Sequence, residues 1–269
     1  MTSRGPVLGV GIVGLGGASL AMLPKIAKNP GFTVAAVADI DQEILVRFAK
    51  DFPDAKTYTS AEEMSGDPSV HLVYIATPNS LHSEHARVAL EQKRHVLIEK
   101  PMTVALRDSD VMIETADRNG VLLGVNVKHS FEARVKKLRD FVRSGELGRF
   151  RMMNSWRYAD WLYRPRTPEE LTPEPGGGIL WRQGPHQFDI LRTIGGGMVR
   201  SVKGLVSVWD TARRVPGSHV AYLDFEDGAV ATAIFSGYDH FESRELVYGT
   251  GDVDPARHAR ARREHREAT

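Results

Sequence analysis

Hydrophobic residues in the first half of the chain follow two alternating patterns. Short continuous apolar runs, typical of buried strands, are each followed by a segment with apolar residues three or four positions apart, which is typical of a helix. Strands that are apolar on both faces are expected where helices cover both sides of a parallel sheet. The predicted strands lie at residues 7–15, 33–39, 70–77, 95–100 and 120–127, and the predicted helices at 19–29, 42–52, 80–92 and 107–118. This alternation predicts a doubly wound α/β fold.

The pattern changes after about residue 127. Residues 132–148 predict one amphipathic helix, whose expected buried side carries Val135, Leu138, Phe141 and Val142. Strand-like segments follow at 149–161, 202–210, 219–228 and 229–239, and a Glu-Asp-Gly turn predicts a hairpin between the last two. We therefore predict a nucleotide-binding domain at residues 1–126 and a second α/β domain, with a largely antiparallel open sheet, at residues 127–269.

The composition excludes several kinds of chemistry. The 35 basic residues nearly balance the 34 acidic ones, so the net charge gives no reason to expect a nucleic acid or a membrane as partner. The chain has no cysteine, which excludes disulfides, iron–sulfur clusters and thiol catalysis. A cytoplasmic location is the natural expectation for such a chain.

The segments at the two ends of the chain each have two interpretations. Residues 5–24 carry no charge and resemble a signal peptide, but their glycines favour a strand followed by a turn. Residues 254–269 are densely charged, and we expect a solvated segment there. A nucleic-acid-binding arm is the alternative for this tail, although it has no interleaved aromatic residues to stack on bases.

A glycine-rich turn follows the first predicted strand. Gly14, Gly16 and Gly17 lie at the carboxyl end of that strand, where a tight turn lets the backbone approach a pyrophosphate at the N-terminus of the next helix. The G-x-G-x-x-G spacing also matches from Gly9 onward, but that match lies within the strand and does not meet this requirement. Ser19 takes the third position of the turn motif, where a small residue lets helix and strand pack closely.

Asp39 ends the second predicted strand, about where such folds place a carboxylate against a ribose. A carboxylate there accepts hydrogen bonds from both ribose hydroxyls and repels a 2′-phosphate. No lysine or arginine occupies the next few positions, so NAD is favoured over NADP. The alternative is that Asp39 only caps the helix that begins near Asp41.

Two more strand ends, together with a later glycine-rich segment, carry a family resemblance. Residues 76–82 read Ala-Thr-Pro-Asn-Ser-Leu-His, Glu-Lys-Pro occupies 99–101, and Gly-Gly-Gly begins a segment that reaches His186. With the glycine turn, these motifs resemble, in the same order, those of the Gfo/Idh/MocA family of NAD(P)-dependent sugar, inositol and diol oxidoreductases. The resemblance spans about residues 7–251. It implies a Rossmann domain followed by a domain whose open sheet often forms the interface of a homo-oligomer.

Family members usually continue for tens of residues beyond the point where this chain ends. Either this sequence is a piece of a longer chain, or the second domain lacks its last elements; missing strands would expose an edge of its sheet.

The resemblance also implies which residues contact NAD. They are Gly14, Gly16, Gly17, Ala18, Asp39, Thr77, Pro78, Asn79, His82, Glu99 and Lys100. In the family, the lysine of the Glu-Lys-Pro motif lies beside the nicotinamide and the reacting carbon, and Lys100 takes this role here. A lysine in that place can hydrogen-bond the substrate oxygen and stabilise developing charge; a surface lysine at a strand end is the alternative. His82 and His85 invite a metal interpretation, but without an HExxH pattern or any cysteine we expect no metal. His82 is expected instead to line the cofactor cleft or to cap the following helix.

His186 is the candidate general base, because an imidazole titrating near neutral pH can take a hydroxyl proton while hydride leaves. The alternative is a histidine that bonds backbone at a helix start. Pro185 means that the helix is kinked or that a new helix starts there. Arg182 stands where family members usually carry an aspartate, and an arginine suits recognition of a carboxylate. The expected substrate-binding residues are Arg182, His129, Arg164 and Arg166.

The leading hypothesis is an NAD-dependent dehydrogenase of a cyclic polyol, sugar or carboxylated cis-dihydrodiol. The segment Trp-Arg-Gln-Gly-Pro-His-Gln and residues 235–252 are similar to a branch of phthalate dihydrodiol dehydrogenases, which agrees with an acidic ring substrate. Aromatic residues that could flank such a ring, or else only pack, are Trp156, Tyr158, Trp161 and Tyr163. Arg182 is about as easily explained by a structural pair with Asp189 or another carboxylate. The alternative function is a dinucleotide-binding sensor without turnover.

Overall fold

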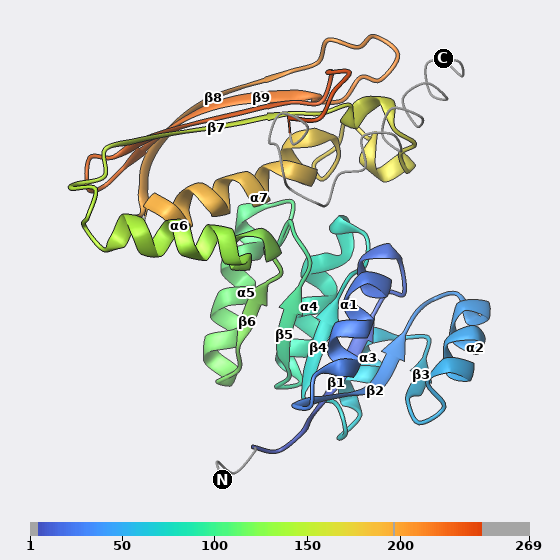
Figure 1. Ribbon diagram of the computed structural model, residues 1–269. Helices are drawn as coiled ribbons and strands as arrows, with labels where there is room; N and C mark the ends of the chain where they lie inside the picture. The colour runs from blue at the N-terminus through green and yellow to red at the C-terminus, as the bar shows by residue number, and fades with distance from the viewer. Residues whose placement is uncertain (1–4, 196, 244–269) are drawn as a thin grey trace. The chain divides into compact units, whose positions relative to one another are not determined.

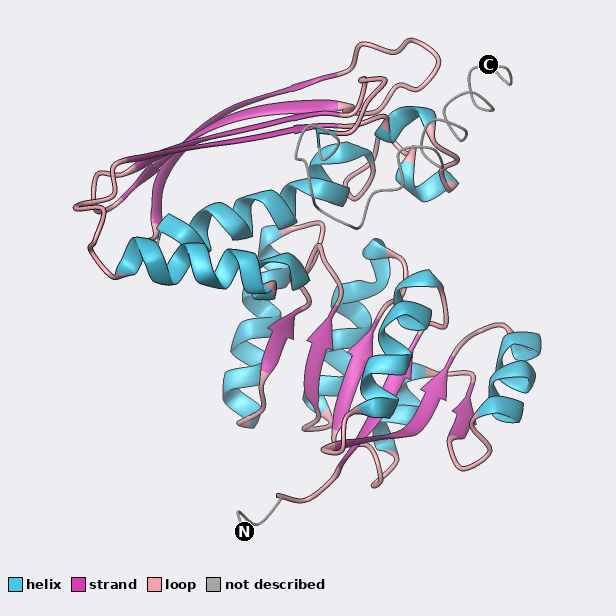
Figure 2. Cartoon of the chain, viewed as in Figure 1, coloured by secondary structure: helices cyan, strands magenta, loops and turns pink. Residues whose placement is uncertain are grey.

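A computed structural model describes residues 5–195 and 197–243 of the chain. It divides into two compact units, Met1–Asn126 and Val127–Thr269 (Figure 1). Each unit contains one sheet with its own helices (Figure 2). The predicted α/β class is confirmed.

The first unit is built on a six-stranded parallel sheet in the order β3-β2-β1-β4-β5-β6. Its strands are β1 (Leu8–Val13), β2 (Phe32–Ala38), β3 (Lys56–Tyr58), β4 (Leu72–Ile75), β5 (His95–Ile98) and β6 (Leu123–Val125). Its helices are α1 (Gly17–Lys28), α2 (Gln42–Asp51), α3 (Ala61–Gly66), α4 (His82–Glu91) and α5 (Leu106–Asn119), with a short 3₁₀ turn η1 (Asn79–Leu81). The chain order reverses between β1 and β4, which is where open sheets of this kind bind ligands.

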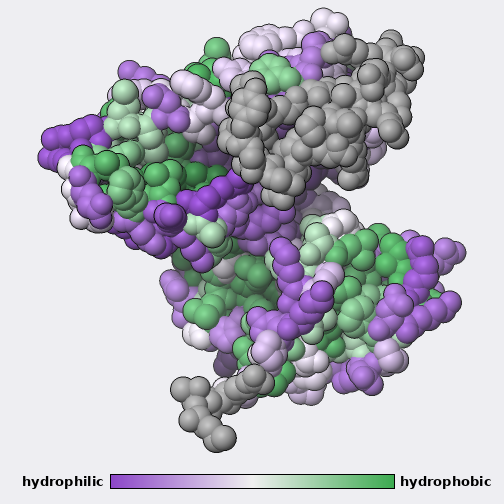
Figure 3. Space-filling view, viewed as in Figure 1, coloured by the Kyte–Doolittle hydropathy of each residue, from purple (hydrophilic) through white to green (hydrophobic). Residues whose placement is uncertain are grey.

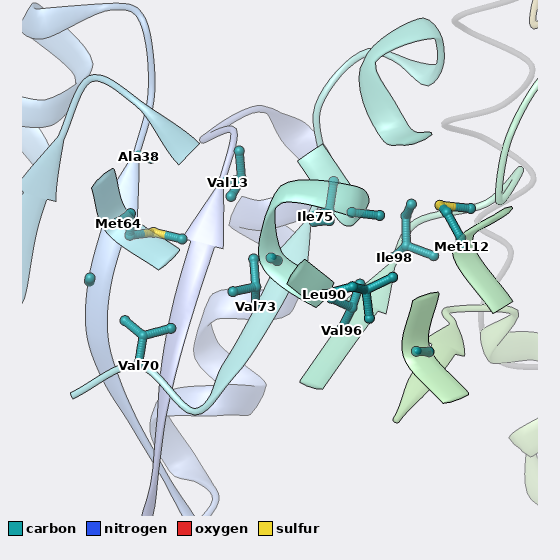
Figure 4. Packing of buried hydrophobic residues seen from close by; sticks show 14 residues of the cluster. Val13, Ala38, Met64, Val70, Val73, Ile75, Leu90, Val96, Ile98 and Met112 are labelled. Carbon is teal, nitrogen blue, oxygen red and sulfur yellow. The ribbon is translucent and has the colours of Figure 1, made fainter. Parts of the chain in front are cut away.

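Two hydrophobic cores lie on opposite faces of this sheet. Successive residues of a strand point to opposite faces, and in β4 Val73 and Ile75 join one core whereas Tyr74 joins the other. The first core, shown in Figure 4, packs the strands against α3, α4 and α5 through residues such as Met64 and Leu90. The second packs them against α1 and α2. Helices on both faces explain why these strands are apolar throughout.

The second unit packs α6 (Ala133–Arg143) and α7 (Gly178–Gly195) beside a four-stranded sheet in the order β7-β10-β9-β8. Its strands are β7 (Met152–Tyr158), β8 (Val199–Ser207), β9 (Ser218–Phe225) and β10 (Val230–Ser236), and its 3₁₀ turns are η2 (Lys128–Phe131), η3 (Trp161–Tyr163) and η4 (Pro168–Glu170). The predicted hairpin joins β9 and β10, with Gly228 in the left-handed region at φ 84°. Its core gathers Leu191 of α7 with the alanines of β9 and β10.

Three expectations from the sequence differ from the structure. The strand β7 pairs with β10 in parallel, so this sheet is mixed although mostly antiparallel. Leu138 and Phe141 of α6 are not buried, since 46% and 42% of their surfaces are exposed, and only Val135 of that helix is buried. The short elements β3 and α3 were not predicted at all.

Apolar side chains also lie at the surface of both units (Figure 3), including Ile40 at 92% exposure and Leu205 at 68%. In residues 5–195 and 197–243, no helix has both the length and the apolar character that crossing a membrane requires.

Candidate active site

The glycine turn between β1 and α1 has the open backbone that a pyrophosphate requires. Gly14 adopts φ 84°, and a Cβ there would meet the Ala76 carbonyl oxygen at 3.0 Å. At Gly16 and Gly17, by contrast, a Cβ would have no atom within 4 Å, so the turn and the exposed start of α1 are accessible. Backbone N–H groups at a helix start bind anions well. The residues present therefore fit a dinucleotide.

The two glycines inside β1 serve packing instead. A Cβ on Gly9 would lie 1.9 Å from the Ser69 carbonyl oxygen, and one on Gly11 would lie 2.8 Å from the terminal methyl of Met64. This supports the prediction that the G-x-G-x-x-G match starting at Gly9 is not the binding turn. Ser19 is buried, and its hydroxyl donates to the Gly14 carbonyl, so the third position of the motif also holds the turn in shape.

Asp39 links the end of β2 to the glycine turn. Its Oδ2 accepts from the backbone N–H of Leu15 at 2.7 Å, and its Oδ1 accepts from that of Asp41 at 3.0 Å. The cap of α2 is Asp41, whose carboxylate accepts from the N–H groups of Glu43 and Ile44. Asp39 is half-buried, and each carboxylate oxygen keeps a further lone pair for a ligand hydroxyl. A carboxylate fixed in this way fits the ribose-binding role predicted for it.

At the end of β4, the two histidines differ from what the sequence suggested. The His82 ring is fully buried between the carbonyl oxygens of Pro101, 2.8 Å from Nδ1, and of Thr77, 3.0 Å from Nε2. His85 bonds the Thr77 hydroxyl at 3.1 Å. Burial lowers the pKa of both rings, against the raising effect of the two carbonyls on His82. A direct cofactor contact from His82 is therefore corrected: its ring ties the turn after β4 to the turn after β5.

Glu99 of the Glu-Lys-Pro motif is held from two sides. Its Oε1 accepts from the Tyr74 hydroxyl and from the Asn126 side-chain amide, both at 2.6 Å, and its Oε2 accepts from the backbone N–H of Lys100 at 3.3 Å. Burial, followed by this hydrogen bond to Glu99, raises the pKa of Tyr74. Tyr74 and Asn126 were not predicted. They lie 25 and 27 residues from Glu99 in the chain, and no local pattern connects them.

Close packing at the start of α7 explains two of the three consecutive glycines at residues 176–178. A Cβ on Gly177 would lie 2.1 Å from the Thr172 carbonyl oxygen. Gly178 adopts φ 70°, and its Cβ would lie 2.8 Å from the carbonyl oxygen of Pro216, which accepts a 2.7 Å bond from Ile179 N–H. These close approaches fix the N-terminus of α7 against neighbouring loops.

Pro185 lies inside α7, which continues without a break from Gly178 to Gly195. Arg182 and His186 are therefore four residues apart on one helix and share a face. Both are half-buried. Of the two arrangements left open by the sequence, a new helix that starts at Pro185 is not observed, because Pro185 lies within a single helix.

Gln187 and His219 anchor α7 to the sheet. The Gln187 amide nitrogen lies 2.9 Å from the Ser155 hydroxyl and 3.1 Å from the Ile234 carbonyl oxygen. The amide oxygen must then accept from Nε2 of His219, at 2.9 Å, which places the proton of that ring on Nε2. Burial lowers the pKa of His219 to about 4. This anchor fixes the rotation of the helix about its axis, and hence the face that carries His186.

His129 contacts His186 within the second unit. The ring centroids are 4.4 Å apart with 74° between the planes, an edge-to-face arrangement. Nδ1 of His129 also bonds the carboxylate of Glu132. His129 was predicted as a substrate-binding residue, whereas Glu132 was not predicted at all.

The three arginines predicted near the substrate have different surroundings. The Arg164 guanidinium forms ion pairs with Asp160 and Glu242. Arg166 donates to the Trp161 carbonyl at 2.8 Å, lies 4.4 Å from the centroid of that indole, and pairs with a carboxylate one turn later. Both guanidiniums are thus bound by other groups of the second unit.

Arg182 interacts electrostatically with Glu169 in the 3₁₀ turn η4. The pKa of Glu169 there is lowered by hydrogen bonds from its own backbone N–H and from the Thr167 hydroxyl, and to a smaller extent by Arg182. An Arg182–Asp189 pair was the alternative to substrate binding. Oδ2 of Asp189 is buried and makes no hydrogen bond to any described residue.

The aromatic residues suggested around a ring substrate do not share one surface. Trp156 is 64% exposed, whereas Trp161 is buried and Tyr163 stacks on His240. Within the part of the chain that the structure describes, no group of three or more histidine, aspartate or glutamate side chains could hold a metal ion.

Comparison with known proteins identifies the family. Residues 8–127 match the family model of oxidoreductases with an NAD-binding Rossmann fold, and residues 135–252 match the Gfo/Idh/MocA C-terminal domain. The chain belongs to the Gfo/Idh/MocA family. A crystal structure of a dehydrogenase-like protein from Bordetella bronchiseptica superposes with a TM-score of 0.89 at 37% identity, over 97% of this chain and 69% of that one.

Two relatives in the Gfo/Idh/MocA family have named activities. A 1-carboxy-3-chloro-3,4-dihydroxycyclohexa-1,5-diene dehydrogenase of Comamonas testosteroni is 39% identical over 92% of this chain and 63% of its own length. A myo-inositol 2-dehydrogenase of Thermotoga maritima is 26% identical over 89% of this chain and 70% of its own length. The chain thus spans less than two thirds of the Comamonas protein.

Proposed function

We propose that the protein is an NAD-dependent dehydrogenase of a carboxylated cyclic diol. The observation that carries this proposal is Arg182, a cation one helical turn before His186 on α7. A guanidinium suits bidentate recognition of a carboxylate. The Comamonas relative, named for a carboxylated dihydroxycyclohexadiene, supports the same substrate class.

The cofactor residues of the proposal lie at the carboxyl ends of β1, β2, β4 and β5. Gly14, Gly16 and Gly17 would hold the pyrophosphate, and Asp39 would accept from the ribose hydroxyls. Because its charge repels a 2′-phosphate, we favour NAD over NADP. Bound NAD would supply the hydride acceptor. Glu99, fixed by two neighbours, orients the backbone from which Lys100 extends.

The proton chemistry belongs to Lys100 and His186 in this proposal. As hydride leaves the hydroxyl-bearing carbon, the hydroxyl proton passes to the His186 imidazole and a carbonyl forms. The role proposed for Lys100 is a hydrogen bond to a substrate oxygen, which stabilises the charge that develops there. In a dihydroxycyclohexadiene, loss of hydride and proton leaves a product that tautomerises to an aromatic diol.

Replacement of Arg182 by methionine tests the substrate class. We expect KM for a carboxylated dihydrodiol to rise roughly a hundredfold, because a charge-assisted hydrogen bond contributes about 1.5–3 kcal/mol. KM for a neutral dihydrodiol or an inositol should change little. Arg192→Met is the matched control, since Arg192 is an exposed arginine in the last turn of the same helix. Equal losses on acidic and neutral substrates would contradict the proposed role.

A dinucleotide-binding sensor without turnover is the second candidate, favoured by Arg182 at a position where the family resemblance led us to expect an aspartate. Absorbance of the reduced cofactor, followed over a panel of polyols and dihydrodiols, separates the two functions. Saturable NAD binding without turnover of any substrate in the panel would favour the sensor.

We also propose that a second copy of the chain covers the outer face of the sheet in the second unit. One row of paired positions crosses all four strands on that face and consists of Trp156, Ile234, Val220 and Leu205. Of these side chains, Trp156, Val220 and Leu205 are 64%, 49% and 68% exposed. A contiguous apolar strip of this kind is typical of a protein interface.

A further inference from the structure

We propose that His129, held by Glu132, is the outlet through which His186 releases its proton to solvent. The inference rests on the proposed function, because it concerns the proton that His186 takes from the substrate. It assigns Glu132 a positioning role and His129 the role of a second proton carrier.

Within the second unit, His129 contacts both His186 and Glu132. His186 extends from α7, and the edge-to-face ring contact places His129 against it at 4.4 Å between centroids. Nδ1 of His129 bonds Oε1 of Glu132, the residue just before α6. The other oxygen, Oε2, lies 2.6 Å from the guanidinium of Arg134. The contacts therefore join His186 on α7 to His129 in the turn η2, and His129 to Glu132 at the start of α6.

The carboxylate fixes which ring nitrogen of His129 carries a proton. The pKa of Glu132 is lowered, since hydrogen bonds from His129 and Arg134 outweigh the raising effect of burial. An ionised carboxylate only accepts hydrogen bonds, so the Nδ1 that bonds it is protonated. In neutral His129 the lone pair is then on Nε2, on the opposite side of the ring. That nitrogen is able to accept a proton.

The exposure of His129 connects the transfer to solvent. All three residues are half-buried, and the side chains of His129 and Glu132 are 38% and 33% exposed, so water reaches both. A proton taken up by His186 moves to Nε2 of His129, through ring reorientation or one bridging water, and then to bulk water. Each transfer moves one proton and no electrons, and returns His186 to the neutral form that the next turnover needs.

Other charges around the pair are compatible with a carrier that is only transiently cationic. Arg134 and Lys136 lie on α6, and the ammonium of Lys136 stands over the Phe131 ring. Arg182 and Asp189 flank His186 on α7 at four and three residues. Glu132 thus pairs with both His129 and Arg134.

Replacement of His129 by phenylalanine keeps a ring against His186 but removes the carrier. We expect kcat in a weakly buffering solution to fall about a hundredfold while KM changes little. Added imidazole should restore most of the lost rate, because a small buffer molecule can take the proton instead. A loss that imidazole does not restore would show a structural role only and would overturn the inference.

Glu132→Gln tests the positioning role. Without the carboxylate, a cationic His129 is less stable, so the rise of kcat with pH should move to lower pH. Glu91→Gln is the matched control: Glu91 is an exposed carboxylate that pairs with Arg87 on α4, in the other unit. An unchanged pH profile for Glu132→Gln, or the same displacement for Glu91→Gln, would count against the assignment.

Histidine titration by NMR tests the coupling without any turnover. In His129→Phe the imidazole that exchanges a proton with His186 is replaced by an apolar ring, so the titration curve of the His186 ring should differ from that in the unmodified protein. If its titration is unchanged, the two rings are not coupled and the inference fails, even in an active enzyme. If the two rings are coupled but the protein turns over no substrate, the proposed function is wrong. That result would leave the contact between the two histidines unchallenged, so the two failures can be told apart.

Discussion

At the scale of single residues, Asp39 is the group expected to discriminate between the two cofactors. Its carboxylate is fixed by the N–H groups of Leu15 and Asp41, so it cannot turn away from a 2′-phosphate. We predict that Asp39→Asn lowers the dissociation constant for NADP relative to NAD by roughly tenfold, as expected if about 1.4 kcal/mol of repulsion is removed. Binding titrations with both nucleotides measure this without a substrate.

Asp41→Asn is the control for that experiment. Asp41 is a neighbouring carboxylate that caps α2, and its removal should weaken the helix without changing the ratio of the two dissociation constants. The prediction fails if the original protein prefers NADP, or if Asp39→Asn leaves the ratio unchanged.

Local motifs made some of these residues predictable and left others hidden. Asp39 and Lys100 follow buried strands in a recognisable order, so sequence alone indicated them. Gln187 makes its contacts with residues 32 and 47 positions away, and Glu132 looks like an ordinary helix-start residue until His129 is seen beside it. Such pairings depend on tertiary structure, which no short pattern records.

At the scale of elements, the anchor of α7 makes the second unit sensitive to acid. The pKa of His219 is lowered to about 4 by burial, whereas an unfolded histidine titrates near 6.5. Below pH 6.5 the unfolded chain binds a proton that the folded chain does not. The free energy of unfolding should therefore fall as the pH drops from 6.5 towards 4, by up to about 3 kcal/mol.

Denaturant unfolding at several pH values measures this loss. His219→Gln can still donate to the Gln187 amide oxygen but does not titrate, so its stability should depend less on pH within that window. His240→Gln, at an exposed histidine of the same unit, should keep the slope of the original protein. An equal slope in all three proteins would exclude His219 as the cause.

Helices and strands with long hydrophobic patterns were predicted more accurately than those with short ones. Long apolar runs such as β1 and β2 were located to within about two residues, as expected for strongly periodic segments. The three-residue strand β3 has too short a pattern to be recognised. The parallel pairing of β7 with β10 was missed because these strands are not consecutive in the chain. The sequence of a single strand does not indicate which other strand lies beside it in the sheet.

At the scale of the whole molecule, the outer face of the second sheet has few charges along its central row. The next row on the same face consists of Asn154, Thr232, Tyr222 and Lys203, which is polar apart from one aromatic ring. An apolar strip bordered by polar positions matches the core and rim of an interface between protein subunits. A sheet face of this kind is the place where a second copy of the chain should bind.

Replacing Leu205 by glutamate tests this arrangement. Leu205 is 68% exposed in the single chain, so the substitution should cost the fold little, but a carboxylate buried without a partner strongly opposes association. We expect the original protein to sediment as an oligomer and Leu205→Glu to sediment mainly as a monomer. Leu122→Glu, at a leucine of the first unit that is 74% exposed, should remain oligomeric. If the original protein is monomeric, or if both variants keep its mass, the face has another role. The sheet would then have to be covered by something other than its own copy, because an exposed apolar row of this length favours aggregation.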